Sequence, residues 1–392
     1  MRLAGRHGAA LPGLVAEKLR PTLLRKLTML PDGIIVVSGT NGKTTTTHLV
    51  AEVLRRSGKR VFTNHSGSNM TRGLLAAIIR FSDWRGRLPF DVAVLEIDEA
   101  YAAKLGPTLR PRGAILTNVL RDQLDRFGEI DYTARLLFDL AASTTDLVVY
   151  NVCDSRLASI PSLSSSARLA SFGYAEKLAE HFVDDDGLYG VPKSVPASDV
   201  TLEAFDSSVH IRDGQEAHSF SAKALPGWHN ALNLTAVYTL LSRLYGIRDD
   251  ASYSDLTPPY GRGETITIRG VDLILQLVKN PVGFRTAMFV HVDRPALIVI
   301  NDRIADGRDV SWLWDVDVEP LRARPSLFCS GTRGYDMALR LKYTDLPAGA
   351  SIDTISAINS FIDQGGGVIF LTYTAMLDIR RYLTKLRKVS KK

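Results

Sequence analysis

The sequence predicts an α/β protein with two domains, each built on a mostly parallel sheet. Short runs of Val, Ile and Leu alternate with helical patterns along the 392 residues, as in sheets that are buried on both faces. A glycine-rich turn joins the first apolar run to a helix, which is typical of a phosphate-binding loop. Because the chain is longer than one ordinary domain, we expect two domains after a short N-terminal segment.

The composition is that of an ordinary globular protein. No apolar run approaches the roughly 20 residues of a membrane span, and we find no secretory signal pattern. The two cysteines, Cys153 and Cys329, are far apart in sequence, which argues against a disulfide scaffold and against a four-cysteine zinc site. We therefore expect a cytoplasmic enzyme.

Positive charge gathers at both ends of the chain, whose net charge is +6. Residues 1–30 hold six basic side chains against one acid, and residues 380–392 hold seven with no acid. Leu14–Met29 predicts an amphipathic helix that is interrupted near Pro21. Such basic runs are usually solvated helix faces, and the alternative is attraction to membrane headgroups or to a pyrophosphate-bearing substrate. Aromatic residues do not alternate with the basic ones, so nucleic acid is not an expected partner.

The first strand leads into a phosphate-binding loop. Ile34–Val37 is an apolar, β-branched run, and Gly-Thr-Asn-Gly-Lys-Thr follows at residues 39–44 before the periodic helix. Backbone N–H groups and the helix N-terminus face an anion in such a loop, where Lys43 would neutralise charge and the Thr44 hydroxyl would reach Mg²⁺. The alternative is an ordinary glycine-rich turn between a strand and a helix.

A second strand, within residues 91–100, ends in acidic side chains. Ligands of doubly wound sheets bind at the carboxyl ends of the strands, so Glu96 and Asp98 are expected near the loop. Carboxylate oxygens there suit Mg²⁺ that is shared with phosphates. The alternative is that these acids only cap the next helix.

Further strands, polar turns and hairpins complete the first domain. Residues 114–118 and 147–151 read as buried strands, and alternation within residues 160–220 predicts β-hairpins. Leu-Pro-Gly-Trp-His-Asn at residues 225–230 places an amide, Asn230, where it can pair with adenine N6 and N7 together. A Pro-Gly turn with Asn230 as a helix N-cap is the alternative.

The second domain is expected to begin at residue 258. Three strand–helix pairs follow, and the apolar run 368–372 completes a parallel sheet. One loop carries Lys279 and Asn280. A second loop, residues 300–315, contains four aspartates beside two tryptophans; they are Asp302, Asp306, Asp309 and Asp315. The alternative for the second loop is a capped turn against which the tryptophans pack.

Several of these motifs resemble those of the Mur ligase superfamily. The resemblance includes Gly-Thr-Asn-Gly-Lys-Thr-Thr, Leu-Pro-Gly-x-His-Asn-x-x-Asn, and Gly-Arg-x-Glu at the start of the second domain. It implies a central P-loop ATPase domain at 31–257 and a Rossmann-like C-terminal domain at 258–392, after a basic helical segment at 1–30. It also implies nucleotide ligands, which are Gly39, Thr40, Asn41, Gly42, Lys43, Thr44, Thr45, Asn230, Lys279 and Asn280. For Mg²⁺ the implied ligands are Thr44 and Glu96.

The chain departs from the superfamily in three places. Gln123 replaces a histidine that helps to hold a second metal, and Arg135 stands where many relatives have a carbamylated lysine nearby. The P-loop begins at residue 39, so we expect no preceding domain for a UDP-linked precursor. These departures argue against an ordinary amino-acid-adding ligase.

Two loops narrow the resemblance to the MurT family, the ligase subunits of lipid II isoglutaminyl synthase. Leu-Val-Lys-Asn-Pro-x-Gly and Asn-Asp-x-x-Ala-Asp-Gly-x-Asp-x-Ser-Trp-x-Trp-Asp are similar to that family, as is Gly-x-Arg-x-Tyr-Asp-Met at 331–337. The resemblance implies ATP- and Mg²⁺-dependent amidation of the D-glutamate α-carboxyl in lipid II, in which Lys43 and Glu96 hold the reacting phosphates. Many members have a four-cysteine zinc ribbon, which is not expected here.

The resemblance also implies a partner and a place in the cell. A glutamine amidotransferase, GatD, supplies ammonia as the other half of a heterodimer, and the ligase subunit contributes one aspartate to its catalytic site. Asp309 is the first candidate for that role and Asp315 the second. The enzyme would then work at the inner face of the membrane. Two alternatives remain: an amino-acid-adding ligase of the Mur or folylpolyglutamate type, and a scaffold subunit that binds ATP without chemistry.

Overall fold

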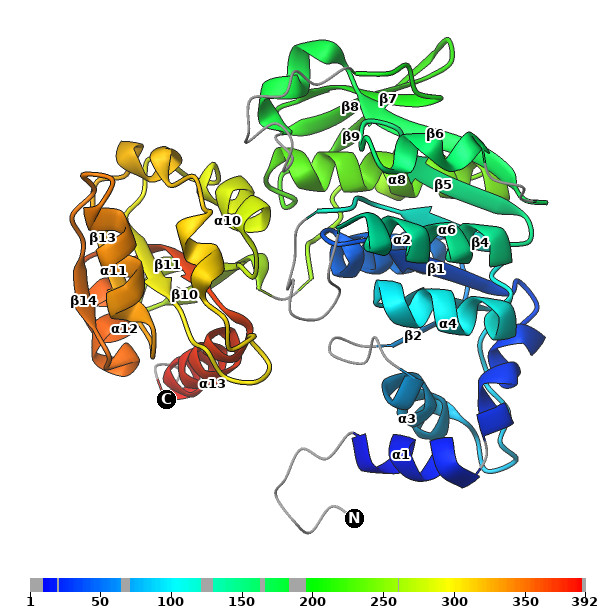
Figure 1. Cartoon of the computed structure of the whole chain (residues 1–392), viewed down its shortest axis with the longest axis horizontal. Coiled ribbons are helices and arrows are strands. Elements are labelled where there is room, and N and C mark those ends of the chain that lie inside the picture. Colours follow the sequence, from blue (N-terminus) through cyan, green and yellow to red (C-terminus); the bar gives the residue numbers. More distant parts are fainter. Residues whose placement is uncertain are drawn as a thin grey trace.

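The computed structural model of the chain describes residues 10–19, 21–64, 71–120, 130–162, 166–182, 195–259 and 261–389. These residues form two lobes, each with its own sheet (Figure 1). The earlier part of the chain, blue to green, forms the larger lobe, and the later part, yellow to red, forms the smaller one. The expectation of two mostly parallel α/β domains is confirmed.

The larger sheet has nine strands in the order β2-β3-β1-β4-β5-β6-β7-β8-β9. All neighbours up to β7 are parallel, and β7, β8 and β9 form an antiparallel meander, so the predicted hairpins are confirmed. The strands are β1 Ile34–Ser38, β2 Val61–Thr63, β3 Val92–Glu96, β4 Gly113–Leu116, β5 Leu147–Asn151, β6 Arg168–Tyr174, β7 Val200–Phe205, β8 Ser208–Asp213 and β9 Glu216–Ser221.

Helices cover both faces of this sheet, which explains why its strands read as continuous apolar runs. In β1, Ile35 and Val37 belong to one apolar cluster, and Ile34 and Val36 belong to the cluster on the opposite face. The helical elements are α1 Ala10–Leu19, η1 Pro21–Met29, α2 Lys43–Arg56, α3 Thr71–Phe81, α4 Glu99–Leu109, α6 Ile130–Ser143, η2 Leu157–Ser162, η3 Glu176–His181, α8 Trp228–Leu244 and α9 Asp250–Tyr253. The predicted interruption near Pro21 is confirmed, because α1 ends at Leu19 and a 3₁₀ helix begins at Pro21.

The smaller sheet has the order β10-β11-β15-β12-β13-β14, and only the β10–β11 pair is antiparallel. The last strand along the chain, β15, lies between β11 and β12. Its elements are β10 Arg262–Ile268, β11 Val271–Leu277, α10 Pro281–Met288, β12 Ala296–Val299, η4 Ser311–Trp314, η5 Glu319–Ala323, β13 Leu327–Ser330, α11 Gly334–Lys342, β14 Gly349–Ser351, α12 Thr354–Asp363, β15 Gly367–Leu371 and α13 Tyr373–Val389.

Residues 284–290 predict the helix of the first strand–helix pair, and the observed helix starts earlier. It begins at Pro281, because the Asn280 side chain accepts the Gly283 N–H at 2.8 Å and proline fits the first helical position. The segment 305–321 is expected to follow the strand of the second pair as its helix, and it contains two 3₁₀ helices instead of an α-helix. Strand β10 was not predicted, because it is partly exposed and its pattern Arg-Gly-Glu-Thr-Ile-Thr-Ile is largely polar.

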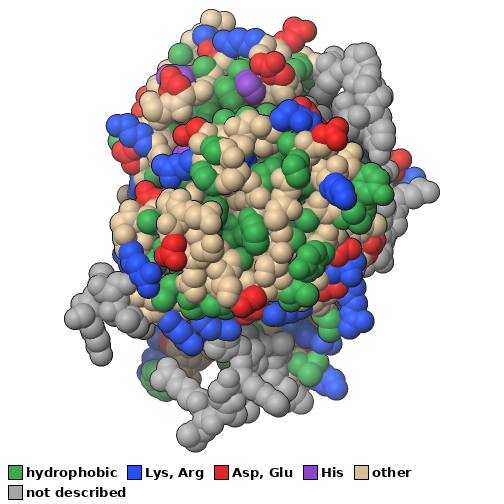
Figure 2. All heavy atoms as spheres, turned by 90° about the vertical axis from the view of Figure 1, so that its left-hand side faces the viewer, with side chains coloured by type: hydrophobic (Ala, Val, Ile, Leu, Met, Phe, Trp, Pro, Cys, Tyr) green, Lys and Arg blue, Asp and Glu red, His purple; other side chains and the backbone are tan. Residues whose placement is uncertain are grey.

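Two further features of the described residues bear on function. None of their helices is both long enough and apolar enough to cross a membrane. Large hydrophobic side chains are exposed on the smaller lobe, and Figure 2 shows them spread over its outward face with charged side chains mostly toward the edges. Among them are Trp314, Tyr335, Leu339 and Tyr343.

Candidate active site

The glycine-rich loop between β1 and α2 requires glycine at two positions. Gly39 and Gly42 have φ angles of 124° and 87°, which side chains rarely adopt. Neighbouring side chains also leave no room, because a Cβ at Gly39 would collide with Thr117 Oγ1 and one at Gly42 would lie 2.6 Å from Asn233 Oδ1. The close approach of these side chains therefore fixes the path of the loop.

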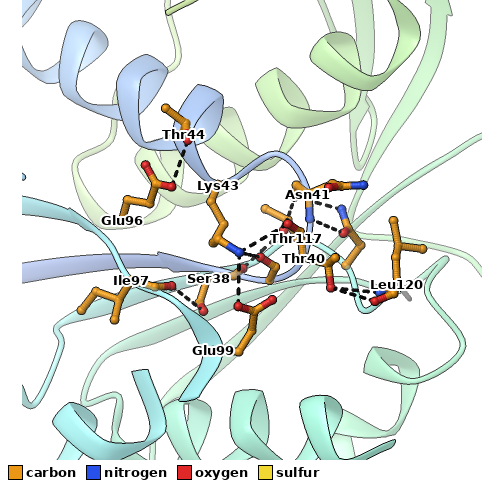
Figure 3. A network of polar contacts seen from close by, with 12 residues as sticks. Ser38, Thr40, Asn41, Lys43, Thr44, Glu96, Ile97, Glu99, Thr117 and Leu120 are labelled. Carbon is orange, nitrogen blue, oxygen red and sulfur yellow. Dashed lines mark hydrogen bonds and ion pairs between the residues drawn. The ribbon is translucent and has the colours of Figure 1, made fainter. Parts of the chain in front are cut away.

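The end of β4 holds the loop from the side. Asn118 Oδ1 accepts the Asn41 N–H at 2.8 Å, and its Nδ2 donates to the Asn41 carbonyl at 3.1 Å. Thr117 Oγ1 donates to the same carbonyl at 2.7 Å (Figure 3). These contacts bring the polar residues that follow β4 to the loop that follows β1, at one edge of the sheet.

Lys43 is buried inside the loop and is fully engaged. Its Nζ donates to the carbonyl oxygens of Gly39 and Thr40, and it lies 3.2 Å from Glu99 Oε2 (Figure 3). The two charged side chains are only 9% and 5% exposed, so removal of either one would leave the other buried without its ion-pair partner. Glu99 was not among the predicted site residues, although it belongs to the same acidic run as Glu96 and Asp98.

Thr44 and Glu96 form a second polar group beside the lysine. Thr44 Oγ1 donates to Glu96 Oε1 at 2.9 Å, and Arg262 Nη2 donates to Thr44 Oγ1 at 3.2 Å. Asn64 fixes the backbone of Glu96 on both sides, since its Nδ2 donates to the Glu96 carbonyl at 2.6 Å and its Oδ1 accepts the N–H at 2.9 Å. Burial lowers the pKa of Arg262 from its usual value, and the negative charge of Glu96 acts in the opposite direction.

This second group fits a magnesium ion. A hydroxyl and a carboxylate oxygen 2.9 Å apart are two hard ligands that can share one cation with phosphate oxygens. The described residues contain no cluster of three or more His, Cys, Asp or Glu side chains able to hold a metal, so the remaining ligands would come from phosphate and water. Gln123, the residue relevant to a second metal, lies outside the described residues.

Arg262 is a site residue that the sequence analysis used only as a boundary marker. It stands in the Gly-Arg-x-Glu motif on β10 and brings a cation from the second domain to Thr44. The motif itself was the available signal, because it places an arginine at the start of a strand in the second domain.

A cavity of about 170 Å³ lies between the loop and the second domain. Asn41, Gly42 and Thr45 form its loop wall, and Lys279 belongs to the opposite wall. The rest of its lining includes the rings of Phe172, Tyr174, His181, Phe182 and His229, while Asn233 lies beside Gly42. This cavity therefore combines a phosphate-type loop with aromatic side chains, as a nucleotide needs.

Asn230 does not belong to the lining of this cavity. Its Nδ2 donates to the Pro226 carbonyl at 2.6 Å, and its Oδ1 is buried without a hydrogen-bond partner among the described residues. His229, the preceding residue, lines the cavity, and burial lowers its pKa to about 4 with a further contribution from the Arg262 charge. Recognition of adenine by Asn230 stays a prediction. The unpartnered Oδ1 is a hydrogen-bond acceptor, which is what the N6 amino group of adenine requires.

Two predicted residues of the second domain reach the loop directly. Lys279 Nζ donates to the Thr40 carbonyl at 3.2 Å. Asn280 and Asn41 form a reciprocal amide pair, with Nδ2-to-Oδ1 distances of 3.0 Å and 3.2 Å in the two directions. The second domain is thus hydrogen-bonded to the loop at the position that the sequence analysis indicated.

The four aspartates of the loop 300–315 separate into two kinds. Asp306 accepts the Thr374 N–H at 2.6 Å, and Asp302 accepts the Thr332 hydroxyl at 2.8 Å, so both tie the loop to the domain. Asp309 and Asp315 are exposed. Asp309 accepts the Ser311 N–H at 2.8 Å, and hydrogen bonds from Ser311 lower its pKa.

Comparisons with known proteins agree along the whole chain. Residues 37–241 match the Mur ligase middle domain, and residues 277–376 match the MurT ligase C-terminal domain. The lipid II isoglutaminyl synthase (glutamine-hydrolyzing) subunit MurT of Staphylococcus aureus (strain COL) is 26% identical over 98% of this chain and 94% of its own length. The corresponding subunit of Streptococcus pneumoniae (strain ATCC BAA-255 / R6) is 29% identical over the same shares of the two chains.

Solved structures share the fold. The MurF ligase from Thermotoga maritima in complex with ADP has a TM-score of 0.71 at 17% identity, and the match covers 95% of this chain and 84% of that one. The folylpolyglutamate synthase of Mycobacterium tuberculosis, complexed with ADP and AMPPCP, has a TM-score of 0.63 at 16% identity. That match covers 96% of this chain and 99% of the synthase chain. At these identities the likeness concerns the fold.

Proposed function

Since the chain belongs to the Mur ligase family and contains a MurT ligase C-terminal domain, we propose that it is the ligase subunit of an amidating synthase of peptidoglycan biosynthesis. Its reaction converts the α-carboxyl of D-glutamate in the stem peptide of lipid II to the amide, with ATP and with ammonia from glutamine. The observation that carries the proposal is the phosphate-binding loop, to which Lys279, Asn280 and Arg262 of the second domain are hydrogen-bonded beside one cavity.

The loop would bind the phosphates of ATP. Lys43 lies at the N-terminus of α2, where backbone N–H groups point at an anion, and it would leave Glu99 to neutralise the phosphates. Thr44 and Glu96 would hold Mg²⁺, which neutralises phosphate charge when it is bound. Arg262 adds a second cation beside Thr44, where it would stabilise the charge of the transferring phosphoryl group.

The chemistry then needs two displacements. A carboxylate oxygen of D-glutamate attacks the γ-phosphorus, the bond to ADP breaks, and an acyl phosphate forms. The nitrogen of ammonia attacks the acyl carbon, phosphate leaves, and the nitrogen loses a proton. In this scheme the residues of the chain position and neutralise the reactants, which is the main contribution that a protein makes to phosphoryl transfer.

Ammonia would come from a GatD-like glutamine amidotransferase bound as the other subunit. Asp309 is our first candidate for completing the amidotransferase site, because it is exposed and ionised while Asp302 and Asp306 are occupied within the domain. Asp315 is the second candidate. It follows Trp314, which is 48% exposed and packs edge-on against Tyr343 with ring centroids 5.6 Å apart. Hydrophobic side chains are exposed among polar groups on the outward face of the smaller lobe (Figure 2), and exposed apolar side chains support docking of a protein partner.

The proposal is tested by ATP-dependent phosphate release with lipid II and glutamine, with and without a co-expressed GatD-like subunit. We expect release only with the partner, together with a product in which one hydroxyl of the substrate is replaced by an amino group. Turnover without the partner that depends on an added free amino acid would contradict it and indicate an amino-acid-adding ligase. Nucleotide binding with no phosphate release in the full mixture would indicate a scaffold subunit.

A further inference from the structure

We propose that the chain binds an anionic membrane surface through a basic face at the amino-terminal edge of its larger sheet. This membrane-facing surface consists of η1, with Arg25, Lys26 and Met29, and of the turn 83–87, with Trp84 and Arg85. The inference rests on the proposed function in one respect, which is that a lipid-linked substrate gives membrane binding a purpose.

The turn 83–87 presents a tryptophan to solvent in a fixed position. The Asp83 N–H donates to the Arg87 carbonyl at 2.9 Å, the Arg87 N–H donates to Asp83 Oδ1 at 2.8 Å, and the two side chains pair at 3.0 Å. These contacts close the turn, and Trp84 at its tip is 86% exposed. Such exposure of a large aromatic residue is uncommon, and tryptophan favours the interface between lipid and water.

The base of the turn is anchored in the core. Phe81 and Phe90 on either side of it pack edge-on against each other and against the buried Phe62, with ring centroids 5.6 to 6.0 Å apart. The exposure of Trp84 is therefore a property of a rigid structure.

A lysine joins the turn to η1. Lys26 Nζ donates to the Gly86 carbonyl, so the 3₁₀ helix and the turn lie side by side. Met29, at the end of η1, is 81% exposed, and Arg25 is exposed as well. Two apolar side chains surrounded by cations form the pattern of an interfacial membrane contact.

The charge of this region favours an anionic partner. The described residues 10–30 and 71–90 contain seven lysines and arginines against two acids, although the whole chain has a net charge of only +6. Both acids are already paired, Glu17 with Arg72 at 2.7 Å and Asp83 with Arg87 at 3.0 Å. The remaining cations are Lys18, Arg25, Lys26, Arg80 and Arg85. A hollow on the same edge is lined by Arg25, Arg110 and Arg112 and by one acid, Asp32, which is paired with Lys59 at 2.9 Å, so its charge favours a headgroup phosphate.

The position is compatible with action on a lipid-linked peptide. Both η1 and the turn precede the amino ends of strands, β1 and β3, whose carboxyl ends hold the phosphate-binding loop and Glu96. Because β1 has five residues, the two edges of the sheet are about 17 Å apart. An extended peptide of about five residues covers that distance.

The test is cosedimentation of the full chain with vesicles of phosphatidylglycerol and phosphatidylcholine, compared with vesicles of phosphatidylcholine alone. We expect binding to the anionic vesicles, which is lost between about 0.1 M and about 1 M salt as the Debye length falls from about 10 to about 3 Å. The variant Arg25→Glu/Arg85→Glu should bind about 30-fold more weakly or worse, since each basic residue near an anionic surface contributes. Trp84→Ala should weaken binding about tenfold.

Matched controls keep the test specific. Lys177→Glu/Lys223→Glu makes the same change in net charge on exposed lysines elsewhere in the larger lobe, and Trp314→Ala removes an exposed tryptophan from the smaller lobe. Both controls should bind vesicles as the unchanged chain does. The proposal is overturned if the unchanged chain does not prefer anionic vesicles, or if the controls lose binding as much as the variants of the proposed surface.

A second readout separates this inference from the proposed function. Vesicle binding is measured without ATP, glutamine or substrate, so it does not depend on whether the chain amidates anything. If the proposed function holds, Arg25→Glu/Arg85→Glu should keep its activity on a water-soluble lipid II analogue and lose activity on lipid II in anionic vesicles. Equal loss on both substrates would contradict a membrane role.

Discussion

The phosphate-binding loop and the aspartate loop 300–315 hold their charges in opposite ways. Lys43 and Glu99 are nearly inaccessible to solvent and are paired with each other inside the larger lobe. Asp309 and Asp315 point their charges into solvent from the smaller lobe. A buried charge needs its partner within the same chain, whereas an exposed charge is stable in water alone and is free to meet another molecule.

The difference indicates which of the two proposed reaction centres the chain completes by itself. Lys43 pairs with Glu99, and Thr44 lies within hydrogen-bond distance of Glu96 and Arg262, so the groups proposed to hold ATP all come from this chain. Among the described residues, neither exposed aspartate has a histidine or a cysteine within hydrogen-bond distance, and Asp309 is bonded only by Ser311. They therefore fit the role of a group that is donated to a site on a partner.

The largest effect is expected at Asp309, in the complex with the amidotransferase. Asp309→Asn should lower glutamine-dependent amidation by up to about 10⁴-fold, the effect of removing a carboxylate that orients a catalytic base. Amidation driven by an ammonium salt should continue, because the ATP site is intact. Product formation with each nitrogen source checks this. Asp315→Asn is the matched control. If only Asp315→Asn lost glutamine-dependent amidation, Asp315 would be the residue that completes the amidotransferase site.

The next effect concerns Lys43. Lys43→Met should lower phosphate release by about 10²- to 10³-fold with either nitrogen source, because the charge that faces the phosphates is gone. It should also cost about 3 kcal/mol of unfolding free energy, since Glu99 is left buried without its cation.

The double variant Lys43→Met/Glu99→Gln separates these two effects. Removing both charges should restore much of the stability in urea unfolding while phosphate release stays low. If Lys43→Met alone released phosphate within tenfold of the unchanged enzyme, the comparison between the two reaction centres would be wrong.

A smaller effect is expected where the two lobes meet. Asn280→Ser keeps an oxygen that caps α10 but is too short to pair with Asn41. The loss of two amide hydrogen bonds should raise the KM for ATP about 5- to 30-fold with little change in stability. Steady-state kinetics and thermal unfolding measure the two quantities. If the two amides act as one unit, Asn280→Ser, Asn41→Ala and the double variant should all raise the KM for ATP by the same factor.

The smallest effect is a pH dependence of stability. The pKa of His229 is about 4 in the folded chain and about 6.5 when unfolded, so between these values the unfolded chain binds one more proton. Stability in urea should therefore fall as pH falls through this range, by at most about 1.4 kcal/mol per pH unit from this residue. His229→Gln should make the slope shallower. Asp309→Asn, at an exposed site, should leave the slope in that range nearly unchanged.

The sequence by itself determined the fold class and the main chemical groups. A β-branched strand, a glycine-rich turn and a lysine followed by threonine are local patterns, and the structure confirms the strand, the turn and the helix where they were expected. The order of strands with polar ends predicted that Glu96 would lie near the loop, because carboxyl ends of parallel strands share one edge, and Glu96 does accept the Thr44 hydroxyl there.

Only the tertiary structure decided which of these groups contact each other. Glu99, the first residue of α4 and three residues beyond the expected Glu96, pairs with Lys43, and Arg262 arrives from a strand more than two hundred residues away in the chain. The four aspartates of one loop look alike in sequence, yet Thr332 and Thr374 engage two of them and leave the other two in solvent. Spacing along a chain specifies local conformation, whereas burial and pairing depend on side chains that are distant in sequence and come together only on folding.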